Sequence, residues 1–93
     1  MQINESNDDH DKKLTIRGNP VQNGILDYTY SSDLKGDVTI SLYDHNGRLV
    51  KEKKEDYKRK ISGTLSLDGA APGSYYITVR QGSILSTKKF IVQ

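Results

Sequence analysis

The chain contains no cysteine and no tryptophan, and its 93 residues include two prolines, one phenylalanine and one methionine. Without cysteine there is no disulfide framework, no thiolate metal site and no thiol redox chemistry. The fold must therefore be held together by apolar burial and by sheet hydrogen bonds. Without tryptophan, an aromatic platform for a ligand has only tyrosine and phenylalanine to draw on.

Long apolar runs are also missing. No segment approaches the roughly 18 to 20 apolar residues that a membrane-spanning helix needs. The first five residues, Met-Gln-Ile-Asn-Glu, lack the basic and apolar regions of a signal peptide. We therefore expect no insertion into a membrane.

Apolar residues make up 33% of the chain and charged residues 28%, and the formal net charge is +2. The length fits a single domain with a thin core. Residues 48–60 carry seven basic residues, but three acidic residues are interspersed among them. This mixture favours an exposed edge strand, where lysines deter pairing with other sheets, over a phosphate-binding surface. We expect no nucleic-acid partner.

Candidate catalytic and metal-binding residues are few. His10 and His45 lie far apart in the sequence, and neither accompanies a nucleophile elbow, a phosphate loop or a paired ligand. The acidic residues around His10 lack the glycine-containing turn of a calcium loop. We therefore expect no enzymatic activity, no cofactor and no metal site, and we interpret His45 as a turn residue.

Apolar and polar residues alternate in short segments, which is the period of a β-strand with one buried face. The clearest case is residues 38–43, where Val38, Ile40 and Leu42 are separated by polar residues. The segments expected to form strands are 14–17, 26–30, 38–43, a fourth beginning at Arg48, 61–67, 75–81 and 84–92. The residues expected to face inward are Leu14, Ile16, Leu26, Tyr28, Val38, Ile40, Leu42, Leu65, Leu67, Tyr75, Ile77 and Val79.

Seven such strands separated by turn signals predict an all-β fold, a seven-stranded immunoglobulin-like antiparallel β-sandwich spanning residues 14–93. Residues 1–13 are polar and show no periodicity, so we interpret them as a flexible leader or linker. The last segment is irregular, because residues 84–85 and 90–92 are apolar in both phases. This pattern predicts either a bulge or burial on both faces there.

The segment from Leu67 to Val79 joins two predicted strands through a turn that contains Pro72-Gly73 and is followed by Tyr75. Proline fixes φ and glycine tolerates unusual backbone angles, so the pair favours a sharp corner. A tyrosine at the start of the next strand can donate a hydrogen bond back to the corner's backbone, as in the tyrosine corner of immunoglobulin-like sandwiches. We predict this role for Tyr75.

Four short motifs follow one another along the chain: Asn19-Pro20, Asn46-Gly47, Pro72-Gly73 with Tyr75, and Lys88-Lys89. In this order they resemble the motifs of the C-terminal sorting domain of proteins exported by the type IX (Por) secretion system of Bacteroidetes. The resemblance covers roughly residues 14–93. Family members usually carry Tyr-Pro-Asn-Pro where this chain has Arg17-Gly18-Asn19-Pro20. The positions that match the family's motifs are Asn19, Pro20, Asn46, Gly47, Pro72, Gly73, Tyr75, Lys88 and Lys89.

The resemblance implies that the domain is a sorting signal that directs the export of a cargo protein. An upstream cargo domain would reach the periplasm by its own signal peptide, and the chain would be a mature form or a C-terminal piece of that longer protein. The outer-membrane secretion machinery would recognise the folded sandwich, and a surface peptidase would remove it within residues 1–13. The destination would be the medium or the outer-membrane surface.

Other functions without catalysis fit the same composition. One is an accessory β-sandwich, such as a carbohydrate-binding or surface adhesion module, and another is a small free-standing secreted protein. In a carbohydrate-binding module, Tyr43, Tyr57 and Tyr76 are the candidates for an exposed stacking platform. Tyr28, Tyr30 and Tyr75 are expected to be buried instead.

Overall fold

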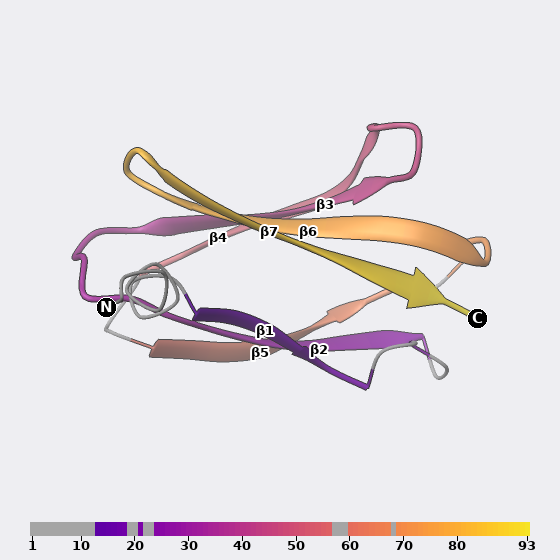
Figure 1. Ribbon diagram of the computed structural model, residues 1–93, viewed down its shortest axis with the longest axis horizontal. Coiled ribbons are helices and arrows are strands. Elements are labelled where there is room, and N and C mark those ends of the chain that lie inside the picture. The colour runs from indigo at the N-terminus through magenta and orange to yellow at the C-terminus, as the bar shows by residue number, and fades with distance from the viewer. Residues whose placement is uncertain (1–12, 19–20, 22–23, 57–59, 68) are drawn as a thin grey trace, which may run out of the picture.

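A computed structural model describes residues 13–18, 21, 24–56, 60–67 and 69–93 (Figure 1). These residues contain no helix, and therefore none long and apolar enough to span a membrane. The seven strands are β1 (Lys13–Arg17), β2 (Ile25–Ser31), β3 (Val38–Asp44), β4 (Leu49–Glu55), β5 (Lys60–Ser66), β6 (Gly73–Gln81) and β7 (Ile84–Val92).

The strands form two sheets that lie face to face (Figure 1). One sheet has three strands in the order β1-β2-β5, and the other has four in the order β4-β3-β6-β7. Every pairing between these strands is antiparallel. The all-β antiparallel sandwich predicted from the alternation is thereby confirmed, with β4 joined to β3 as the second strand of a hairpin.

The core lies between the sheets and is made from one face of each. All the residues expected to face inward are buried except Ile16, which is half-buried and packs against the core. Tyr30 is also fully buried, as expected. The remaining core members are Val21, Phe90 and Val92.

The prediction that the last strand, β7, has a bulge or is buried on both faces was wrong. Its pairing with β6 runs without a register shift from Val92 to Ile84. Phe90 is 0% exposed, whereas Leu85 and Ile91 are 52% and 37% exposed. The apolar residues of the second phase therefore lie on the outer face of the sheet, in contact with solvent.

Strand β4 is an edge strand, as the charged run predicted, and it carries charge on its inward-facing side as well. Lys51 Nζ donates a hydrogen bond to the carbonyl oxygen of Ser66 at 3.0 Å, which joins β4 to β5 of the opposite sheet. Lys53 Nζ lies 3.0 Å from Glu55 Oε2. Burial raises the pKa of the Tyr28 hydroxyl, and the nearby positive charge of Lys53 acts in the opposite direction. These long side chains cover one open side of the sandwich, and inward-pointing charge blocks further strand pairing.

Gly63 makes room for a core tyrosine. It is the cross-strand partner of Tyr28, and a Cβ built at Gly63 would lie 2.9 Å from the Tyr28 hydroxyl oxygen and 3.2 Å from its ring. A side chain there would push the ring out of place. Glycine inside this strand thus permits close approach of the aromatic ring.

Candidate functional site

The hairpin between β3 and β4 is organised by Asp44. The Asp44 carbonyl accepts a hydrogen bond from the Gly47 N–H at 2.9 Å, and its Oδ1 accepts from the N–H groups of Asn46 and Arg48 at 2.9 and 3.0 Å. Gly47 has a φ of +84°, which favours glycine. The prediction that His45 is a turn residue is confirmed. Strand β4 begins one residue later than predicted, since Arg48 is used by the turn.

The same hydrogen bonds set the charge of Asp44. The pKa of the Asp44 carboxyl is held below its usual value, mainly by the hydrogen bond from the backbone N–H of Arg48. The N–H of Asn46 and the Arg48 guanidinium lower this pKa further, whereas desolvation raises it. The carboxylate is therefore ionised at neutral pH. Its contribution to stability is present above the unfolded-state pKa and is lost as the pH falls through the lower folded-state pKa.

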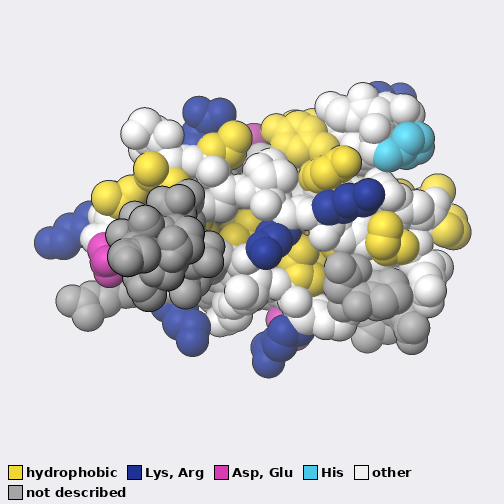
Figure 2. Space-filling view, in the orientation of Figure 1, with side chains coloured by type: hydrophobic (Ala, Val, Ile, Leu, Met, Phe, Trp, Pro, Cys, Tyr) yellow, Lys and Arg dark blue, Asp and Glu magenta, His cyan; other side chains and the backbone are white. Residues whose placement is uncertain are grey.

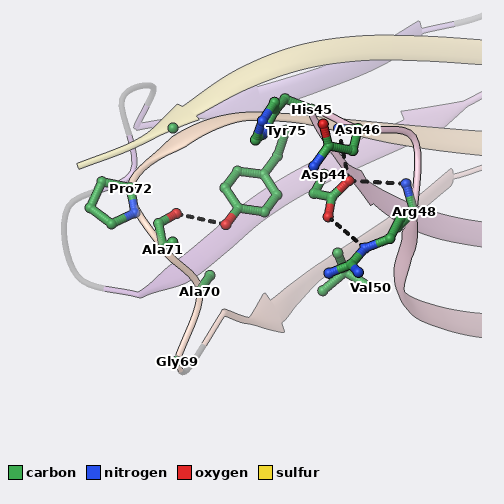
Figure 3. A pocket seen from close by; sticks show the side chains of 11 residues that line it. Asp44, His45, Asn46, Arg48, Val50, Gly69, Ala70, Ala71, Pro72 and Tyr75 are labelled. Carbon is green, nitrogen blue, oxygen red and sulfur yellow. Dashed lines mark hydrogen bonds and ion pairs between the residues drawn. The ribbon is translucent and has the colours of Figure 1, made fainter.

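The corner between β5 and β6 is built around Tyr75. Its hydroxyl donates a hydrogen bond to the Ala71 carbonyl oxygen at 2.6 Å, so the predicted tyrosine corner is confirmed (Figure 3). The ring also stacks on Phe90, with 5.8 Å between ring centroids. Gly73 has a φ of +147°, an angle that glycine tolerates, at the point where the corner enters β6.

The hairpin and the corner meet at one end of the sandwich. A shallow cavity of about 360 Å³ is lined by Asp44, Asn46 and Arg48 from the hairpin and by Pro72 and Tyr75 from the corner (Figure 3). Two motifs that are about 25 residues apart in the sequence thus line one hollow. We call this end of the molecule the motif end.

The last residues of the chain reach the motif end as well (Figure 1). Val92 pairs with Gly73 on one side and with Val21 in parallel on the other. The N–H of Val21 donates to the Ile91 carbonyl at 2.7 Å, and the N–H of Gln93 donates to the Val21 carbonyl at 3.0 Å. Asn19 and Pro20 lie outside the described residues. Sequence reasoning missed Val21 because it is a single apolar residue outside any alternating segment; its hydrogen bonds join it to the end of β7.

Lys88 and Lys89 are neighbours in the middle of β7 and belong to opposite faces of the sheet. Lys88 is the partner of Ile77, which is buried, and Lys89 is the partner of Tyr76, which is 36% exposed. Because neighbours in a strand alternate between faces, Lys88 belongs to the inward-facing phase at the sheet edge, and Lys89 lies on the outer face. Both lysines are exposed.

Comparison with known protein families matches residues 18–93 to the family described as the secretion system C-terminal sorting domain. The chain belongs to this family. The matched range includes the Asn19-Pro20 motif, the β3–β4 hairpin, the tyrosine corner and β7, so the motifs that carried the resemblance all fall within it. The domain is a C-terminal sorting signal for cargo of type IX secretion. A search of curated proteins finds no match.

Replacing Tyr75 by phenylalanine is expected to lower the free energy of unfolding by about 1 kcal/mol, since it removes one hydrogen bond and keeps the ring. Tyr76→Phe is the matched control, because its hydroxyl belongs to the outer face, and we expect a change below about 0.5 kcal/mol. Urea denaturation of both variants measures the difference. Equal losses would contradict the assignment of Tyr75 as the corner.

Proposed function

We propose that this sorting domain is a non-catalytic export signal, and that the outer-membrane machinery of type IX secretion recognises it as a folded sandwich. A surface peptidase then cuts within residues 1–13 and separates the sandwich from the cargo domain that precedes it. The cargo travels through the periplasm and ends at the cell surface or in the medium. Membership in the family supports this route.

The motif residues divide into those that build the fold and those that remain available to a partner. Gly47 and Gly73 occupy backbone angles that favour glycine, and Tyr75 and Phe90 are buried. The turns and the core account for these four residues without a partner. Lys89 differs, because its side chain is exposed on the outer face of the four-stranded sheet.

Lys89 belongs to a continuous row across that face. Tyr43 pairs with Tyr76, and Tyr76 pairs with Lys89, so the three side chains lie side by side on β3, β6 and β7. We call them the tyrosine-lysine row. Ile91, two residues further along β7, is 37% exposed on the same face. Tyrosines beside a cation and an apolar group suit a protein interface, with a partner surface that is apolar and acidic.

The observation that carries this proposal is that the terminal motif exposes Lys89 beside Tyr76 while Phe90 and Val92 enter the core.

An export assay tests the proposal, with the domain fused behind a signal peptide and a fluorescent cargo in a host with type IX secretion. Lys89→Ala is expected to reduce cargo in the medium and on the surface and to increase it in the periplasm. Lys88→Ala removes the same charge from the neighbouring residue on the other face and should leave export near the level of the unchanged fusion.

Thermal melts of both lysine variants serve as the folding control, because exposed lysines contribute little to stability. If the two substitutions reduce export equally while both melts are unchanged, the machinery reads the charge of β7 and not the outer face. If neither reduces export, and Tyr76→Ala also exports normally, the tyrosine-lysine row is not the recognition surface.

A further inference from the structure

A second hollow lies on the outer face of the four-stranded sheet, and sorting does not account for it. Its volume is about 550 Å³, within the range of small-molecule sites. Strand β3 supplies Thr39, Ser41 and Tyr43 to its lining, and β6 supplies Thr78, the cross-strand partner of Ser41. Leu85 of β7 lines it as well. The hollow therefore presents three hydroxyl-bearing side chains from neighbouring strands together with a tyrosine.

Two cations line the same hollow in a single row. Lys54 of β4 and Arg80 of β6 are both cross-strand partners of Thr39, one on each side of it. Strands are spaced about 4.8 Å apart, so the two backbones are separated by about 10 Å with a threonine between them. Both side chains are exposed, and within the described part of the chain neither forms an ion pair.

The one carboxylate of the hollow already has a hydrogen-bond partner. Glu52 accepts a hydrogen bond of 3.4 Å from the hydroxyl of Ser41, its cross-strand partner. Its row is the next one along the sheet from the row of Lys54 and Arg80. The hollow thus has a cationic row and, beside it, a row of hydroxyl and carboxylate groups.

We propose that this hollow binds an anionic saccharide unit of a polysaccharide. Arg80 presents a planar fork that matches a carboxylate or sulfate, and Lys54 adds a second charge from the other side. The hydroxyls of Thr39 and Thr78 can each donate and accept hydrogen bonds, as sugar hydroxyls require. Tyr43 supplies an aromatic surface for the apolar face of a sugar ring and a polar tip beside it.

Affinity electrophoresis of the whole chain in native gels tests this proposal. The gels contain polygalacturonate, whose anion is a carboxylate, dextran sulfate, whose anion is a sulfate, or neutral dextran. We expect retardation by at least one acidic polymer and none by dextran. Lys54→Gln with Arg80→Gln should weaken binding at least tenfold. Thr78→Val, which keeps the shape and the charge, should weaken it several-fold.

A matched control removes the same charge elsewhere. Lys35 lies between β2 and β3 and Lys60 begins β5, and both are exposed and outside the hollow. Lys35→Gln with Lys60→Gln should bind as the unchanged chain does. Retardation by only one acidic polymer identifies the anion and supports the proposal.

Three outcomes would overturn the saccharide site. They are no retardation by either acidic polymer, equal weakening by the two double variants, and equal retardation by dextran. Tyr43 lines the hollow and also belongs to the tyrosine-lysine row, whereas Lys54 and Arg80 lie outside that row. Export of the fusion carrying Lys54→Gln with Arg80→Gln is therefore expected to be normal. The saccharide site and the recognition surface can therefore fail independently.

Discussion

Removal of residues 88–93 is expected to unfold the domain. The deletion takes Phe90 and Val92, which are 0% and 7% exposed, out of the core and removes both hydrogen bonds to Val21. Phe90→Ala alone should lower the free energy of unfolding by about 3–5 kcal/mol, from lost burial and the cavity left behind. Domains of this kind have only about 5–15 kcal/mol in total. Urea denaturation followed by circular dichroism measures both effects.

Ile91→Ala is the matched control for Phe90→Ala. Ile91 is the next residue in β7 but is 37% exposed on the outer face, so the substitution should cost less than about 1 kcal/mol. A truncated domain that kept the melting transition of the full chain would contradict the role of β7 in the core. Until folding is controlled, loss of export after truncation says nothing about recognition. The single substitutions at Lys88 and Lys89 avoid this confusion.

The strands and their buried faces could be predicted because each strand has one face in the core and one in solvent. Val38, Ile40 and Leu42 show this directly, since the sequence alternates and the structure buries all three. The tyrosine corner was also predictable, because Tyr75 and its acceptor residue Ala71 are only four residues apart. Local geometry decides such a contact.

Features that depend on how the sheets assemble could not be predicted. In β7, Leu85 and Ile91 are as apolar as the buried residues, and only pairing with β6 shows that they face outward. The neighbours Tyr43, Tyr76 and Lys89 come from three strands, and no sequence spacing joins them. Both candidate surfaces on the outer face therefore required the strand order and register.

A second feature of this kind is Gln81, a polar residue at the end of β6 that is only 1% exposed. Its Oε1 accepts hydrogen bonds from the hydroxyls of Tyr30 at 3.1 Å and Ser32 at 2.7 Å. Its Nε2 donates to the carbonyls of Leu34 at 3.3 Å and Gly36 at 3.0 Å. One amide thus joins the two sheets and holds the connection between β2 and β3, at the end of β6 opposite the motif end.

Replacing Gln81 by leucine is expected to lower the free energy of unfolding by about 2–4 kcal/mol, because buried groups of both sheets lose the amide that bonds them. Arg80→Ala, at the exposed neighbour, should change it by less than about 0.5 kcal/mol. A double-mutant cycle with Tyr30→Phe sharpens the test. If the amide acts through the Tyr30 hydroxyl, the two losses should fall short of additive by roughly 0.5 kcal/mol or more. Additive losses would show that the amide does not act through the Tyr30 hydroxyl, and a Gln81→Leu variant as stable as the unchanged chain would show that the sheets are held together without this network.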